Sequence, residues 1–139
     1  MVCYITAIKY NIQIEKLSAQ EFRPTKNGEI LSDKELKIKK ISKNDCLKSF
    51  DAKISGNING WLFAKVVFGS GGHQDNVFEE AHILCEWIIK YSKKDEYFII
   101  LIDTDKKSKV DELKIKYDSI IIGNHIEIQQ YFINMFTIT

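Results

Sequence analysis

The sequence is poor in cysteine, and the three it has, Cys3, Cys46 and Cys85, form an odd set without a CxxC pair. This pattern argues against a zinc site and indicates free thiols in a reducing cytosol. No apolar stretch approaches the roughly 18 residues that span a bilayer, and the N-terminus does not resemble a signal peptide. We therefore expect a soluble cytoplasmic domain without a membrane partner.

The chain also lacks a strong excess of charge of one sign. Its net charge is +1, which excludes strong steering of the whole molecule toward polyanions but leaves room for a local basic face. One arginine and 19 lysines accompany 23 isoleucines and 8 asparagines. Isoleucine, lysine and asparagine have AT-rich codons, so lysine abundance reflects genome composition before function. Residues 1–59 carry 11 basic and 7 acidic side chains, and residues 60–139 carry 9 and 12.

The length of 139 residues fits one domain and is too short for two ordinary ones. Hydrophobic residues make up 45% and charged residues 28% of the chain, the balance of a globular protein rather than a disordered one. A chain of this size buries roughly two thirds of its unfolded surface, so it can form a core without disulfides or a structural metal. We find no internal repeat or linker and treat residues 1–139 as a single domain.

The first half of the chain is predicted to hold four strands and one short helix. β-Branched and aromatic residues favour the strands, and a tract rich in glycine and asparagine favours a hairpin between the last two. Ser32 and Glu35 have the spacing of a capping box, which predicts a helix to about Lys40. The expected strands span residues 2–10, 12–16, 47–55 and 61–68.

The second half alternates helices with buried strands. Apolar residues at helical spacing predict a helix from about Asp75 to Tyr91, with Asp75 or Asn76 as its cap. The order of elements predicts an α/β fold, a three-layer sandwich with a central mixed β-sheet flanked by helices. The other expected elements are strands at 97–102 and 119–122 and helices at 108–117 and 126–136.

Charged residues stand in two places where a core strand favours apolar ones. Alternation in 50–54 places Asp51 and Lys53 on one face, and Lys65 interrupts an apolar run. A lysine in such a strand is costly unless it is paired or reaches a wet cleft. Lys65 therefore belongs either to a site or to a solvated edge strand.

Three acids, Asp75, Glu79 and Glu80, open the helix that follows. Asp75 and Glu79 are four residues apart and share a helix face. Two carboxylates can hold Mg²⁺, and a nearby lysine can stabilise a pentavalent phosphate or help to orient and deprotonate the attacking water. Together with Asp51 and Lys65, these acids provide the minimum set of functional groups for hydrolysing a phosphodiester.

An acid on one strand of a hairpin, a lysine on the next and a GG-containing loop before a helix resemble the core of PD-(D/E)XK nucleases. The stretch GSGGHQDNVFEEA, followed by YFIILIDTD, is most similar to type II restriction endonucleases of that superfamily. The resemblance covers about residues 50–132. It implies a restriction endonuclease-like fold and a Mg²⁺-dependent endonuclease that hydrolyses phosphodiester bonds in double-stranded DNA.

The resemblance matches Asp51 to the first acid of the family and Lys65 to the lysine of its second half-motif. Phe63 occupies the acidic position two residues before Lys65, Ala64 is no substitute, and Phe50 stands where the family often has proline. If no other carboxylate reaches the site, the nuclease is inactive or altered at Phe63 or Ala64.

Some restriction enzymes of this superfamily draw the missing carboxylate from the following helix. Glu79, 14 residues after Lys65, fits that arrangement, with Glu80 as the near alternative. The resemblance thus implies Asp51, Lys65 and Glu79 as catalytic residues, with Mg²⁺ held by Asp51 and Glu79.

Nucleic-acid contacts are expected from the loop and helix start that follow Lys65. His73 could contact a phosphate or a base edge, and the amides of Gln74 and Asn76 can pair bidentately with adenine. Lys53, which spells D-x-K with Asp51, is a further candidate. Because two cuts in a duplex suit two-fold symmetry, we expect a homodimer.

Two alternatives remain open. The glycines between residues 69 and 72 could cradle a phosphate at a helix N-terminus, although neither GxGxxG nor GK[ST] is present. Asp103 and Asp105 resemble the DxD of Toprim nucleases and primases, or form an Asx turn that caps the next helix. The alternatives are a nucleotide-binding or Toprim-like domain and a non-catalytic α/β module that binds nucleic acid or protein.

Overall fold

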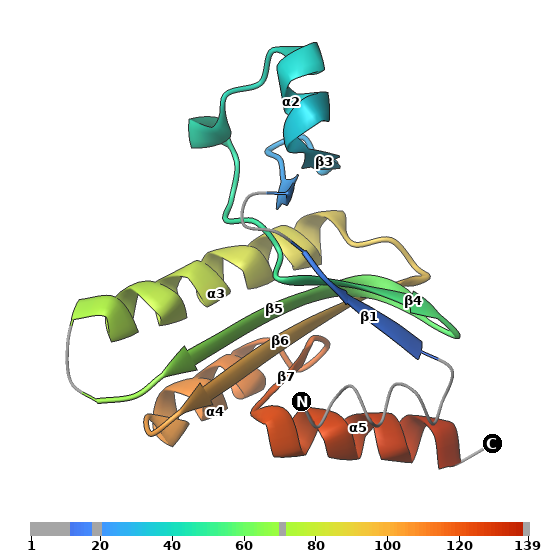
Figure 1. Ribbon diagram of the computed structural model, residues 1–139. Coiled ribbons are helices and arrows are strands. Elements are labelled where there is room, and N and C mark those ends of the chain that lie inside the picture. The colour runs from blue at the N-terminus through green and yellow to red at the C-terminus, as the bar shows by residue number, and fades with distance from the viewer. Residues whose placement is uncertain (1–11, 18–20, 70–71, 138–139) are drawn as a thin grey trace.

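The computed structural model describes residues 12–17, 21–69 and 72–137, of which residues 72–75 and 136–137 are described by their backbone alone. Four helices, one 3₁₀ turn and seven strands lie in this part of the chain (Figure 1). In chain order they are β1 (Ile12–Lys16), β2 (Phe22–Pro24), β3 (Ile30–Ser32), α2 (Asp33–Lys39), η1 (Lys43–Asp45), β4 (Ala52–Gly56), β5 (Asn59–Val67), α3 (Gly72–Tyr91), β6 (Glu96–Thr104), α4 (Lys107–Lys116), β7 (Ile121–Gly123) and α5 (His125–Thr137).

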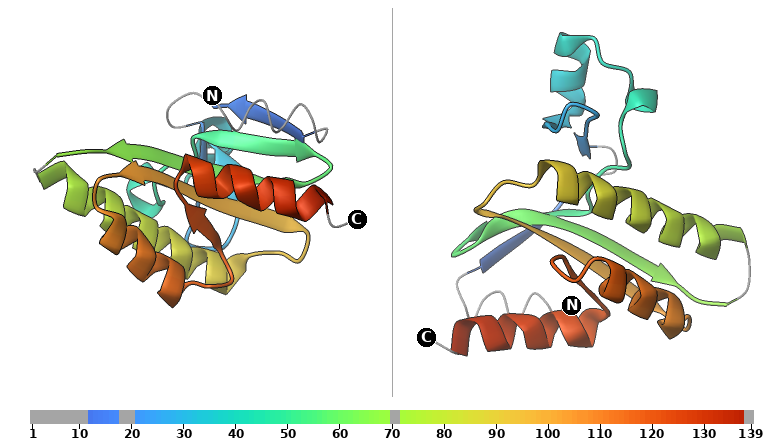
Figure 2. Two further views of the ribbon diagram at one scale, coloured as in Figure 1. Left: turned by 90° about the horizontal axis from the view of Figure 1, so that it is seen from below. Right: turned by 180° about the vertical axis from the view of Figure 1, so that it is seen from behind.

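Five strands form a mixed sheet in the order β1-β4-β5-β6-β7. β1, β4 and β5 pair antiparallel, whereas β5, β6 and β7 pair parallel. Helices α3 and α4 lie side by side on one face and α5 covers the other (Figure 2). This is the predicted three-layer α/β sandwich.

The two faces of the sheet carry separate cores because side chains alternate along each strand. On β5, Phe63 packs into the core beneath α3 and α4, while Leu62 packs into the core beneath α5. On β6, Ile100 and Ile99 divide in the same way. β6 is therefore the buried central strand that its continuous apolar run predicts.

Residues 21–50, which we call the excursion, leave the sheet between β1 and β4 (Figure 1). They hold the small antiparallel pair β2–β3, α2 and η1. The capping box of α2 is confirmed, since Ser32 Oγ accepts the N–H of Glu35 and Glu35 Oε1 accepts the N–H of Ser32. Trp87 Nε1 on α3 donates to the carbonyl of Thr25 at 2.7 Å, which ties the excursion to α3.

Three details of the predicted elements need correction. β4 begins at Ala52 rather than at residue 47, because the backbone N–H groups of Leu47 and Phe50 instead bond to carbonyls at β2. The excursion contains β2 and β3, which the sequence did not predict. α3 begins at Gly72, so neither Asp75 nor Asn76 is its cap. The strand expected at 2–10 lies outside the described residues.

Within the described ranges, no helix is long and apolar enough to cross a bilayer.

Candidate active site

Asp51, the residue just before β4, lies beside Lys65 near the carboxyl end of β5. The hairpin register places Ala52 opposite Leu62, and the N–H of Asp51 donates to the carbonyl of Leu62 at 2.9 Å. Asp51 Oδ2 accepts the N–H of Ala64 at 2.8 Å, and Asp51 Oδ1 lies 3.4 Å from Lys65 Nζ. One carboxylate oxygen is thus fixed by the backbone, and the other faces the ammonium group.

The pair lies where β5 becomes exposed, since residues 61–63 are buried and Val66 is 71% exposed. The side chains of Lys65 and Asp51 are 31% and 35% exposed, whereas Phe63, two residues before Lys65, is only 2% exposed. Residues two apart share a sheet face, and Lys65 Nζ lies 5.2 Å from the centroid of the Phe63 ring. Lys65 therefore stands on the α3 face, where the buried Phe63 supports its stem.

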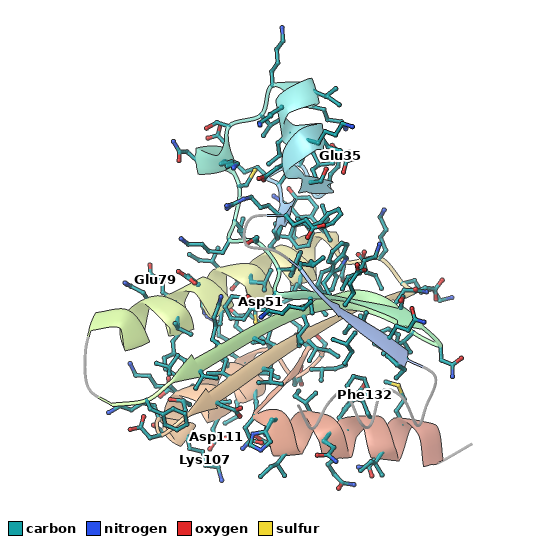
Figure 3. All side chains as sticks on the ribbon, in the orientation of Figure 1. Glu35, Asp51, Glu79, Lys107, Asp111 and Phe132 are labelled. Atoms are coloured by element: carbon teal, nitrogen blue, oxygen red, sulfur yellow. The ribbon has the colours of Figure 1, made fainter. Side chains whose placement is uncertain are left out.

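The two helix acids point in different directions. Phe78, Ala81 and Cys85 mark the side of α3 that is buried on the sheet. Glu79 is exposed and lies apart from Asp51, on the outer side of the helix (Figure 3). Glu80 is half-buried and lines the same cavity as Phe63. The structure brings Asp51 and Lys65 together, and it places Glu80 rather than Glu79 beside Phe63.

Asp51 and Glu80 are the described carboxylates that could hold a metal here. Among the described residues, no three His, Cys, Asp or Glu side chains gather closely enough to bind a metal by themselves. Mg²⁺ usually takes only one or two protein carboxylates and fills its remaining positions with water and substrate phosphate. Asp51 could therefore serve such an ion only if water and a substrate phosphate completed its coordination.

The other predicted nucleic-acid contacts are spread over the α3 side. The side chains of His73 and Gln74 lie outside the described part, and Asn76 is exposed near the start of α3. Lys53 is exposed on β4, with Nζ 5.5 Å from the Trp61 ring centroid. Trp61 is four residues from Lys65, about 13 Å along the strand, so Lys53 lies at the far end of this face.

Asp103 and Asp105 form structural contacts at the carboxyl ends of β5 and β6. Asp103 Oδ1 accepts the N–H of His125 at 2.9 Å and lies 3.0 Å from His125 Nδ1. Asp105 Oδ2 accepts the N–H of Gly69 at 3.2 Å. Asp103 therefore contacts the start of α5, and neither aspartate caps α4, whose N-cap Lys106 has no side-chain cap. The expected Asx cap of the next helix is wrong.

A polar cluster at the surface between α3 and α4, built on the buried Tyr117, involves no predicted site residue. Tyr117 OH donates to Glu86 Oε1 at 2.8 Å and lies 2.9 Å from His82 Nδ1. Burial and the Glu86 carboxylate raise the pKa of the Tyr117 hydroxyl. Burial also raises the pKa of the neighbouring Cys85 thiol to about 12, so Cys85 is a packed thiol rather than a nucleophile.

Sequence reasoning missed a basic groove beside the candidate site. A cavity of about 560 Å³ lies between the excursion and α3, and Arg23, Lys43, Lys48 and Glu80 line it together with Phe63. Two signals could have indicated it: the single arginine of the chain and the basic excess in residues 1–59. The sequence does not show that these basic residues share one cavity, because the cavity forms only where the excursion packs against α3.

Comparisons with known proteins do not assign the chain to a family. No family model matches the chain, and neither does a curated protein or a solved structure.

Proposed function

We propose that this chain is a Mg²⁺-dependent endonuclease that hydrolyses phosphodiester bonds in double-stranded DNA. The observation that carries the proposal is the Asp51–Lys65 pair, an acid and a lysine on adjacent strands at the accessible end of an otherwise apolar hairpin. The resemblance to restriction endonucleases of the PD-(D/E)XK superfamily supports the same two residues. So does the sheet, in which an antiparallel meander is followed by a helix and a parallel strand.

The reaction requires charge stabilisation and an activated water. A water oxygen forms a bond to phosphorus, one P–O ester bond breaks, and the departing oxygen takes up a proton. Bound Mg²⁺ would supply positive charge at the phosphate oxygens and polarise the water. Asp51 would hold the ion through Oδ1, because the N–H of Ala64 fixes its other oxygen and orients the carboxylate.

Lys65 would act on the water and on the charge that develops at phosphorus. Its Nζ is within reach of Asp51 Oδ1 and is accessible to a phosphate. A preorganised cation placed where negative charge develops stabilises the transition state more than the ground state. Its contact with the Phe63 ring limits the positions that the ammonium group can take.

The second carboxylate is better supplied by Glu80 than by Glu79. Glu80 lines the cavity that Phe63 also lines, and Phe63 occupies the position where the family carries its acid. Glu79 lies on the outer side of α3. The Toprim-like alternative has less support, since both Asp103 and Asp105 accept backbone N–H groups.

Two further expectations belong to the proposal. A duplex has two strands to cut, so two copies of the chain would act together as a homodimer. Sedimentation of the full chain with and without duplex DNA tests this. The expected cellular location is the cytoplasm, where DNA and Mg²⁺ are both accessible.

The direct test is metal-dependent cleavage of supercoiled plasmid by the full chain. We expect nicked and linear products in Mg²⁺, their loss on adding EDTA, and their return with excess Mg²⁺. Asp51→Asn keeps an oxygen for the N–H of Ala64, so it should fold and fail to cleave. Plasmid that stays intact at every Mg²⁺ concentration would contradict the proposal, and DNA binding without cleavage would favour the non-catalytic binding module.

A further inference from the structure

The groove between the excursion and α3 has an unusual electrostatic lining. Arg23, Lys43 and Lys48 line one cavity together with Glu80, and the charge of Lys43 is balanced by Asp33, whose Oδ2 lies 3.1 Å from Lys43 Nζ. The excursion as a whole carries eight basic and five acidic side chains, although the complete chain is close to neutral. Part of this positive excess, Arg23 and Lys48, lies on the wall that faces α3.

Arg23 is the most informative residue of this groove. It is the single arginine in a chain that otherwise uses lysine. Its Nη1 donates to the carbonyl of Leu47 at 3.3 Å, which anchors the guanidinium at the groove. Its Nε is buried, and within the described residues no protein acceptor reaches it. A buried donor without an acceptor is rare in folded proteins. Arg23 as a whole is only half-buried, so an anion in the groove would contact the terminal nitrogens of the guanidinium rather than Nε.

The shape of the guanidinium indicates which anion. Arginine presents its N–H groups in a planar fork that matches the oxygens of a phosphate. Lys48, exposed at the same groove, adds a point charge that suits a second phosphate of the same strand. Ile83, which is 46% exposed, gives the groove an apolar surface on which a sugar can pack, above the buried Phe63 and Leu84.

The position of the groove favours a polymer over an isolated phosphate. Phe63 lines the groove, and its ring also contacts Lys65, so the groove and the Asp51–Lys65 pair adjoin one another. A strand with one phosphodiester at Asp51 and Lys65 would continue along the groove, since successive phosphates of a strand are 3.4 Å apart along the helix axis.

We propose that the groove lined by Arg23 and Lys48 binds the phosphate backbone of duplex DNA next to the bond that Asp51 and Lys65 address. This inference rests on the proposed endonuclease function for its choice of polymer. In this proposal the excursion holds DNA against the sheet beside Asp51 and Lys65, and we call this role a DNA clamp. The contacts are to phosphate, so they contribute affinity and register rather than sequence preference.

The test measures binding separately from cleavage. A fluorescein-labelled DNA duplex is titrated with the full chain in EDTA and followed by anisotropy at several salt concentrations. Arg23→Gln/Lys48→Gln should weaken binding at least tenfold and reduce the slope of log K against log salt by about 2, because each lost phosphate contact removes about 0.9. The matched control is Lys34→Gln/Lys37→Gln, which removes two exposed charges of α2 outside the groove. The control should bind within about twofold of the wild type.

Each outcome decides between the two proposals. If the groove variant binds as well as the control variant, the clamp is wrong, and cleavage by the wild type would leave the endonuclease intact. If the groove variant loses binding and the wild type never cleaves, the groove stands and the endonuclease fails. Lys48→Glu alone, at an exposed position, repeats the test should Arg23→Gln disturb folding. Displacement of DNA by millimolar inorganic phosphate at constant ionic strength would assign the groove to isolated phosphate and overturn the DNA clamp.

Discussion

Asp51 Oδ1 lies 3.4 Å from Lys65 Nζ, and this contact joins the residue just before β4 to the carboxyl-terminal part of β5. The pair is partly exposed, and the surrounding β5 residues are largely buried. Exposed ion pairs contribute only about 0–1 kcal/mol to stability. We therefore expect the Asp51–Lys65 contact to add little to the stability of the fold.

Lys65→Met should show whether Lys65 contributes to catalysis or to the stability of the fold. The substitution keeps an unbranched stem over Phe63 and removes the ammonium group. We expect a loss of less than about 1 kcal/mol in the free energy of unfolding. DNA binding in EDTA should stay within about twofold of the wild type. A large loss of stability, measured by urea denaturation, would show that Lys65 is a structural residue.

The two glutamates of α3 form a matched pair for testing the second carboxylate. Glu80→Gln should lower the rate of Mg²⁺-dependent cleavage by about 10²–10³-fold, the usual effect of losing one preorganised electrostatic group. Glu79→Gln removes the same charge from the outer side of the helix and should leave the rate within about twofold. A larger loss of cleavage rate for Glu79→Gln than for Glu80→Gln would instead support Glu79 as the second carboxylate, as the resemblance implied.

Glu127 is expected to make stability depend on pH. Burial raises the pKa of its carboxyl, but hydrogen bonds from Lys114 and from the N–H of Asn124 outweigh that effect, and the pKa lies below its ordinary value. A carboxyl with a lowered folded pKa stabilises the protein above its unfolded pKa of about 4.3, and this contribution is lost as pH falls through the folded value.

Glu127→Gln should accordingly cost about 1 kcal/mol at pH 7, since it removes the ion pair with Lys114 and weakens the cap of α5. The difference from the wild type should shrink when urea denaturation is repeated near pH 3. Glu112→Gln, at an exposed position of α4, is the control. A difference that stays constant from pH 7 to pH 3 would argue against this account.

Gly60 is required by the close approach of β5 and β6. A Cβ atom at this position would lie 1.9 Å from the carbonyl oxygen of Tyr97. Gly60→Ala should therefore destabilise the protein by about 3 kcal/mol, at the upper end of the usual cost of overpacking.

Gly69→Ala provides the comparison for this prediction. Gly69 has a φ of +89° but no atom within 4 Å of an added Cβ, so only backbone strain of about 1 kcal/mol is expected. Equal losses for the two variants in thermal or urea unfolding would contradict the packing argument at Gly60.

The layers of the fold and the Asp51–Lys65 contact could be predicted from local patterns. Alternation fixes which face each hairpin residue takes, and the short loop between Gly56 and Asn59 fixes the register that brings Asp51 beside Lys65. Both signals lie within 15 consecutive residues.

The remainder depends on contacts between distant segments. β2 and β3 have three residues each, too few to show a hydrophobic period. The cavity that Glu80 lines is formed by the excursion, which Trp87 holds through the carbonyl of Thr25, 62 residues away in the chain. Likewise Asp103 bonds to His125, 22 residues further on, instead of to the helix that follows it. No spacing within a motif encodes these partners.

The most direct measurement of the central claim is the single-turnover rate of DNA cleavage in Mg²⁺, compared between the wild type, Lys65→Met and the exposed-loop control Lys94→Met. The account predicts cleavage by the wild type and by Lys94→Met at similar rates, and a rate about 10²–10³-fold lower for Lys65→Met. Equal rates for Lys65→Met and Lys94→Met would contradict the assignment of catalysis to the Asp51–Lys65 pair.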